Sequence, residues 1–185
     1  MSALGYWQVT ILVVVPAVLI ASIIDYRAKK VPNWLNASLA AAGLLTQSLY
    51  FGWSGLAASG LGLLVGLGVL IVPWAMGGMG AGDVKLMGAI GAWFGPWMTF
   101  VAFCVGGVIG GVIAVAMIAW TRKTSQAWLN FGLIIVKMRR LETAFGDFAS
   151  VRSLDSSAAL LPYGIPLSIG SVIVLFGQCL EWWVL

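Results

Sequence analysis

Residues 77–86 read Gly-Gly-Met-Gly-Ala-Gly-Asp-Val-Lys-Leu, and they place the carboxylate of Asp83 and the ammonium of Lys85 directly after an apolar segment. A carboxylate at a membrane boundary is energetically costly, so it indicates a functional site by default. The first apolar segment ends in a similar way, with Asp25 in the run Asp-Tyr-Arg-Ala-Lys-Lys-Val-Pro-Asn at residues 25–33. We therefore expect the rest of the chain to be a scaffold that brings Asp25 and Asp83 together.

The composition is that of a polytopic membrane protein. Of the 185 residues, 61% are hydrophobic and 9% are charged, whereas soluble domains carry roughly 25% charged residues. The net charge of +4 comes from basic residues beside apolar segments, which favours membrane orientation over nucleic-acid binding. The chain has no His, and Cys104 and Cys179 lie apart in apolar runs. We therefore expect no metal site, no cofactor and no Cys/His or Ser/His/Asp chemistry.

Hydropathy predicts six membrane-spanning helices, an all-α fold and a single domain over residues 1–185. The fourth apolar segment is short for a crossing of about 30 Å. However, the basic cluster around Arg27 and the one that begins at Arg122 can both be cytoplasmic only if an even number of crossings separates them. The short segment must then cross, which places both termini outside. The expected segments are 7–24, 34–50, 56–76, 84–94, 97–120 and 160–180.

Several local features support this division of the chain. The basic residues follow the first segment rather than precede it, so it is expected to be a retained span and not a signal peptide. Pro32 suits the opening turn of the second helix, residues 51–55 suit a short turn, and Gly62 and Gly66 suit close helix packing. Residues 121–160 are expected to form a cytoplasmic loop that could include an interfacial helix.

In this topology Asp25 and Asp83 lie at the same membrane face. Two carboxylates a few Å apart do not both ionise easily, and they come to share a proton. One can then take a proton from water while the other donates a proton to a carbonyl or a leaving amine. Arg27 and Lys85 each follow an aspartate by two residues, so in a helix they do not face it. We expect them to point toward lipid headgroups.

Three motifs resemble those of the prepilin peptidases, or type IV leader peptidases, which are membrane aspartyl proteases of the GxGD type. Asp-Tyr-Arg-x-x-x-Val-Pro-Asn, Gly-x-Gly-Asp-x-Lys and Leu-Pro-Tyr-Gly-Ile-Pro occur in the family's order and span nearly the whole chain. The resemblance implies that Asp25 and Asp83 are the catalytic pair. It also implies a supporting role for the other motif residues, namely Arg27, Pro32, Asn33, Gly80, Gly82, Lys85, Pro162, Tyr163 and Gly164.

By the same resemblance, the substrates are prepilins or pseudopilins, cut between a basic leader and an apolar helix at the cytoplasmic face of a bacterial inner membrane. Larger family members carry a cytoplasmic region with paired cysteines and also N-methylate the new pilin N-terminus. This chain has no such insertion and no CxxC pair. It is therefore expected to be a peptidase only, similar to the short enzymes of tight-adherence (Flp-type) pilus systems.

Other interpretations remain open from the sequence. Asp25 alone could be an ordinary interfacial charge, the glycine run could be a turn, and Asp147 and Asp155 are most simply solvated. A small transporter that uses the aspartates as an ion or proton relay would prefer carboxylates near the middle of the bilayer and repeated halves, and the sequence shows neither. A structural assembly subunit would explain the glycines but not two aspartates at one face. The oligomeric state is not predicted.

Overall fold

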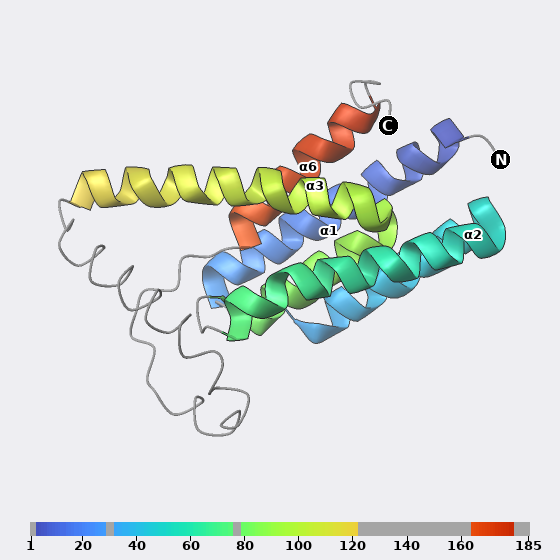
Figure 1. The fold of residues 1–185 in the computed structure, drawn as a ribbon, viewed down its shortest axis with the longest axis horizontal. Helices are drawn as coiled ribbons and strands as arrows, with labels where there is room; N and C mark the ends of the chain where they lie inside the picture. Colours follow the sequence, from blue (N-terminus) through green and yellow to red (C-terminus); the bar gives the residue numbers. More distant parts are fainter. Residues whose placement is uncertain (1–2, 29–31, 76–78, 122–163, 180–185) are drawn as a thin grey trace.

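The computed structural model describes residues 3–28, 32–75, 79–121 and 164–179, and every regular element within these ranges is an α-helix. Figure 1 shows α1 (Ala3–Ala28), α2 (Asn33–Ala75), α3 (Ala81–Thr121) and α6 (Gly164–Cys179). The predicted all-α class is thereby confirmed. Helices α1, α2 and α3 are each long and apolar enough to cross a membrane, and α6 is a shorter apolar helix. The count of six crossings and the side of the termini stay predictions.

Helix α2 contains the second and third predicted segments and reverses direction at one residue. Gly52 has φ 63° and ψ −141°, a backbone conformation that only glycine adopts without strain. The two arms, residues 33–51 and 53–75, run back along each other (Figure 1). The five-residue turn expected over residues 51–55 is therefore wrong in length, because a single glycine accomplishes the reversal and its neighbours stay helical.

Helix α3 reverses in the same manner at Gly95, which has φ 75° and ψ 175°. Pro96 follows, where its missing N–H removes no helical hydrogen bond because the second arm is only beginning there. The short arm, residues 81–94, contains the fourth predicted segment, and the long arm, residues 96–121, contains the fifth. The sequence signal at Gly95 and Pro96 therefore marked the correct boundary.

The short arm of α3 is the centre of the packing, since residues 86–95 are all buried. Both arms of α2 lie against it. A Cβ atom at Gly62 would collide with the carbonyl oxygen of Gly91, and one at Gly66 would collide with that of Met87. These glycines therefore allow backbone-to-backbone contact, as expected for small residues at membrane helix interfaces. The predicted packing role of Gly62 and Gly66 is confirmed.

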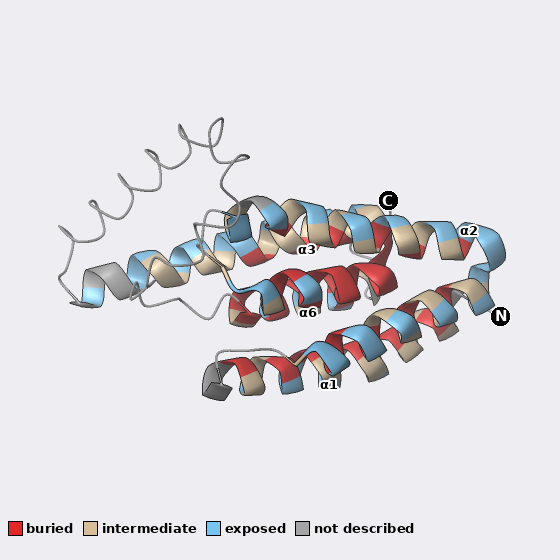
Figure 2. Ribbon diagram, turned by 90° about the horizontal axis from the view of Figure 1, so that it is seen from below, coloured by how far each residue is buried: buried red, intermediate tan, exposed pale blue. Residues whose placement is uncertain are grey.

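Helix α6 lies between α1 and α3 and packs against both. Figure 2 shows buried residues over most of α6 but only along one stripe of α1. On one side, Gly170 allows contact with the backbone of Gly106 in the long arm of α3. On the other side, Ser22 of α1 donates a hydrogen bond to Ser168 at 2.8 Å. The helix that bears Asp25 thus makes more contacts with α6 than with either α2 or α3.

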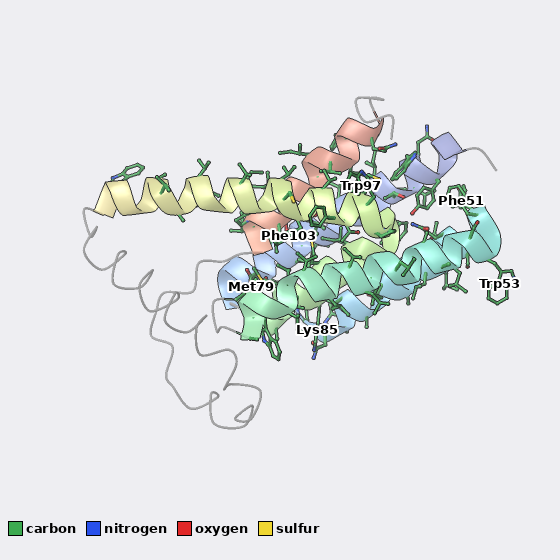
Figure 3. All side chains as sticks on the ribbon, viewed as in Figure 1. Phe51, Trp53, Met79, Lys85, Trp97 and Phe103 are labelled. Atoms are coloured by element: carbon green, nitrogen blue, oxygen red, sulfur yellow. The ribbon has the colours of Figure 1, made fainter. Side chains whose placement is uncertain are left out.

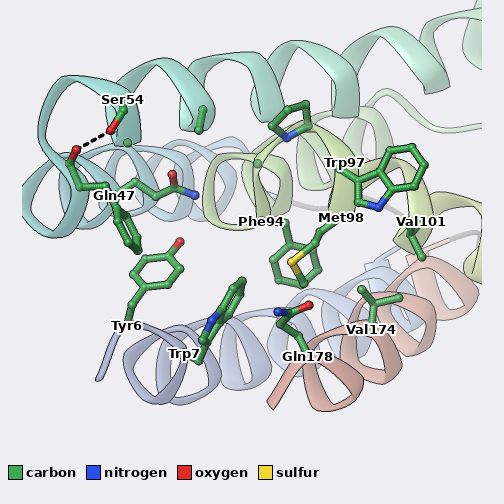
Figure 4. A pocket seen from close by; sticks show the side chains of 15 residues that line it. Tyr6, Trp7, Gln47, Ser54, Phe94, Trp97, Met98, Val101, Val174 and Gln178 are labelled. Atoms are coloured by element: carbon green, nitrogen blue, oxygen red, sulfur yellow. Dashed lines mark hydrogen bonds between the residues drawn. The ribbon is translucent and has the colours of Figure 1, made fainter. Parts of the chain in front are cut away.

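The end of the bundle opposite Asp83 contains the start of α1, the two glycine reversals and the end of α6. There the Tyr6 hydroxyl and the Gln47 amide both donate to the carbonyl oxygen of Trp93. A cavity of about 470 Å³ lies at this end, and Figure 4 shows Tyr6, Trp7 and Gln178 among the side chains around it. The short arm of α3 therefore reaches from Asp83 to the end of the bundle that contains the start of α1.

Candidate active site

The two predicted catalytic aspartates lie in terminal turns of two different helices. Asp25 stands three residues before the end of α1, and Asp83 lies in the first turn of α3. Both side chains are buried, with 7% and 5% of their surfaces exposed. The Asp83 N–H donates to the carbonyl oxygen of Gly80 at 3.1 Å, which closes the turn with which α3 begins. The glycine run thus ends in a backbone turn that sets the direction of Asp83.

Both carboxylates point at the first residue of α6. A Cβ atom at Gly164 would lie 2.9 Å from Oδ2 of Asp25 and 3.1 Å from Oδ1 of Asp83. The two carboxylate oxygens are both this close to one point, so the distance between them is no greater than the sum of these two Cβ–oxygen distances. A methyl group at this position would be too close to both carboxylates for them to stay where they are. Asp25, Asp83 and Gly164 are therefore brought together from positions far apart in the sequence.

These carboxylate oxygens have an unusual environment. Oδ2 of Asp25 and Oδ1 of Asp83 are buried and have no hydrogen-bond partner among the described residues. Burial of a carboxylate without a partner is costly, and two adjacent carboxylates repel each other when both are ionised. The positive N-terminal ends of α3 and α6 favour a negative charge here. A shared proton with one net negative charge satisfies all three conditions, and this is the form suited to acid and base catalysis.

The first turn of α2 holds the segment around Asp83. Asn33 accepts a hydrogen bond from the Lys85 ammonium at 2.8 Å, and the Asn36 amide donates to the carbonyl oxygen of Gly82 at 3.3 Å. These contacts join the Pro-Asn end of the first motif to the Gly-x-Gly-Asp-x-Lys motif. Lys85 is exposed and points out of the bundle (Figure 3), so it does not neutralise Asp83.

The remaining predicted site residues are placed as follows. Pro32 directly precedes α2, and its carbonyl oxygen accepts the Asn36 N–H at 3.4 Å. Gly80 is exposed, and Gly82 lies inside the first turn of α3. The side chain of Arg27 and the residues Pro162 and Tyr163 lie outside the described part of the chain. The roles of these residues stay predictions.

Sequence reasoning did not identify Asn36 as a site residue. Its side chain is 4% exposed, and its Oδ1 atom has no donor among the described residues. The available signal was its position, one helical turn after Asn33, which places both amides on one face of α2. A buried amide in an otherwise apolar helix needs a partner, and here one partner is the backbone beside Asp83.

Comparisons with known proteins point in the same direction as this geometry. A sequence model described as the type IV leader peptidase family matches residues 12–115, which is more than half of the chain. The prepilin leader peptidase/N-methyltransferase of Escherichia coli strain K12 is 33% identical over 131 residues, which cover 64% of this chain and 57% of that protein. The chain thus spans somewhat more than half the length of this curated relative. No solved structure shows significant similarity to the chain.

Proposed function

Because the chain belongs to the type IV leader peptidase family, we propose that it is a membrane aspartic endopeptidase that removes the basic leader from prepilins or pseudopilins. The observation that carries this proposal is the convergence of Asp25 and Asp83 on Gly164. Both aspartates lie within the bundle at one end, buried and without a described cation against them. This arrangement suits a pair that exchanges protons with a peptide bond.

The proposed chemistry needs only the two carboxyl groups and water. The ionised aspartate takes a proton from water as the water oxygen bonds to the scissile carbonyl carbon. The protonated aspartate donates its proton to the carbonyl oxygen, which gives a neutral diol intermediate. The newly protonated aspartate then gives its proton to the amide nitrogen, while the other aspartate takes a proton from one hydroxyl of the diol. The C–N bond breaks to leave a carboxylic acid and an amine, and the pair returns to its starting protonation state. Burial of the pair strengthens each of these electrostatic interactions.

We further propose the predicted placement in a bacterial inner membrane. The arms of α2 and α3 would each cross, giving six crossings with both termini outside and the aspartates at the cytoplasmic face. A leader rich in basic residues remains on the cytoplasmic side, so its junction with an apolar helix would arrive at that face. For residues 1–185, which contain no CxxC pair, we propose peptidase activity alone, as in the Flp-type systems.

The transporter hypothesis is less well supported. An ion or proton relay across a membrane uses carboxylates near the middle of the bilayer. Here Asp25 lies near the end of α1, and Asp83 is the third residue of α3. The described helices thus place both groups at one end of the bundle, where they suit a reaction at a membrane face.

Incubation of the purified protein with a candidate prepilin tests the proposal. Mass spectrometry should locate a single cut between the basic leader and the apolar helix. An intact substrate in lipid and in detergent, with a properly folded protein and several prepilins tried, would contradict the proposed function.

A further inference from the structure

A second polar cluster lies on the face of the short α3 arm that is turned away from the aspartates. It opens into a groove of about 420 Å³. One wall is the start of α2, the other wall is the returning arm of α2, and the floor is the short arm of α3. The lining includes Asn33, Asn36, Ala37, Ala40, Leu63 and Lys85.

The groove is polar at one end and apolar along its length. Lys85, Asn33 and Asn36 lie at the end formed by the first turns of α2 and α3. Beyond them, the walls carry only alanine, leucine and glycine. A molecule that fits this pattern has a polar head and an apolar chain.

The positive charge at the polar end of the groove favours a molecule with a negatively charged head group. Lys85 is exposed, and its hydrogen-bond partner is the uncharged amide oxygen of Asn33. The two carboxylates of the described residues both face Gly164 instead. The Lys85 ammonium therefore has unsatisfied attraction for an anion at the mouth of an apolar groove. Basic pockets between membrane helices at the cytoplasmic side have this character when they bind acidic lipid headgroups.

We propose that this groove binds one acidic phospholipid, with the phosphate at Lys85 and an acyl chain along Ala37, Ala40 and Leu63. The groove lies on the opposite face of the α3 short arm from Asp83, so the lipid site does not include the proposed catalytic pair. It is nevertheless connected to the active-site turn, since Asn36 lines the groove and also donates to the carbonyl oxygen of Gly82. A bound lipid therefore stabilises the first turn of α3, which carries Asp83.

Native mass spectrometry of the protein in detergent tests the site, with phosphatidylglycerol as the probe and phosphatidylcholine with the same acyl chains as the comparison. Wild-type protein should retain one phosphatidylglycerol more strongly than phosphatidylcholine. Lys85→Gln should weaken retention about fivefold, because one interfacial cation contributes about 1 kcal/mol to such binding. Phosphatidylglycerol should also raise the melting temperature of the wild type, since a ligand stabilises the state that it binds. Soluble glycerol phosphate, which lacks the chain, should neither displace the lipid nor raise the melting temperature.

A substitution that blocks the groove distinguishes lipid binding within the groove from general attraction of lipid to a basic surface. Ala37 is exposed on the groove wall, so Ala37→Phe should fill the groove without disturbing the core and should abolish both lipid effects. Ser38→Phe is the matched control, because Ser38 is exposed on the same turn but does not line the groove. It should behave as the wild type does. Equal retention by Ala37→Phe and wild type, or equal retention of the two lipids by the wild type, would overturn the proposal.

Discussion

The space between the two aspartates is small enough for one methyl group to matter. Gly164→Ala would place its Cβ 2.9 Å from Asp25 Oδ2 and 3.1 Å from Asp83 Oδ1, so one or both carboxylates must move. A displacement of about 1 Å in a catalytic geometry can reduce the rate about 10²-fold. We expect Gly164→Ala to lose activity to that degree while it stays folded, as measured by prepilin cleavage and by yield from the membrane.

Gly107→Ala provides the matched control for this substitution. Gly107 lies in the long arm of α3, and a Cβ built there meets no atom within 4 Å. Cleavage by this variant should remain near the wild-type rate. Wild-type activity in Gly164→Ala would show that the two carboxylates do not need the space at this point.

Asn36 has a role that a kinetic measurement can separate from general stability. Its amide holds the carbonyl oxygen of Gly82, so Asn36→Ala should loosen the turn that positions Asp83. Loss of such a hydrogen bond typically changes free energy by about 1 kcal/mol. We expect kcat to fall about fivefold with KM little changed, because Asn36 acts through Asp83 rather than on the substrate.

Ser38→Ala is the control for Asn36, since its hydroxyl donates only to the Leu35 carbonyl on the outside of α2. It should leave both kinetic constants unchanged. A rise in KM alone in Asn36→Ala would assign Asn36 to substrate binding and contradict the positioning role.

The sequence identifies the two aspartates as candidate site residues more readily than it identifies Asn36. Asp25 and Asp83 stand out because a charge beside an apolar segment is costly wherever the chain folds. Asn36 fits a helical pattern without conflict, and its partner is a backbone carbonyl, which no pattern of side chains reveals. Gly164 was named through its motif, but its closeness to both carboxylates could be found only once the helices were placed in space.

At the scale of the helices, Gly95 controls whether the short arm of α3 can end where it does. With φ 75° and ψ 175°, it occupies a region that is essentially limited to glycine. Gly95→Ala should therefore destabilise the folded protein by about 1–3 kcal/mol. Thermal unfolding in detergent should show a lower midpoint than wild type for Gly95→Ala and the wild-type midpoint for Gly107→Ala. An unchanged midpoint for Gly95→Ala would mean that the reversal tolerates a side chain.

The two reversals were not equally predictable. At Gly95 the following proline marks the start of a new helix, so the boundary could be read from the sequence. At Gly52 the sequence predicted a short turn over residues 51–55, whereas the residues on both sides of the glycine are helical and only Gly52 has non-helical backbone angles. Periodicity locates apolar segments well, but the length of a reversal depends on backbone angles that it does not encode.

For the whole molecule, the topology is the prediction with the widest consequences. Single cysteines, introduced after replacement of Cys104 and Cys179, should be labelled from outside at Ser54 and at the C-terminus, and from inside at Lys123. The short arm of α3 must cross for this pattern to hold, because it determines the parity between the two basic clusters. External labelling at position 123 would show that the short arm does not cross.

The central claim is that Asp25 and Asp83 act together as the catalytic pair, and substitution of each by asparagine tests it most directly. Asn keeps the shape of the side chain but cannot exchange the proton, and steps of general acid or base catalysis are worth ~10²–10⁴ in rate. The measurement is the initial rate of prepilin cleavage by Asp25→Asn, Asp83→Asn and the double variant, with Asp147→Asn as the control.

We predict that each single variant loses cleavage while its amount in the membrane stays normal, because the substitution removes a buried charge. The double variant should be scarcely worse than either one, since residues that act as a unit are not additive, and Asp147→Asn should remain close to wild type. Cleavage at a near-normal rate by either single variant would contradict the account. So would loss of activity that only follows loss of the protein from the membrane.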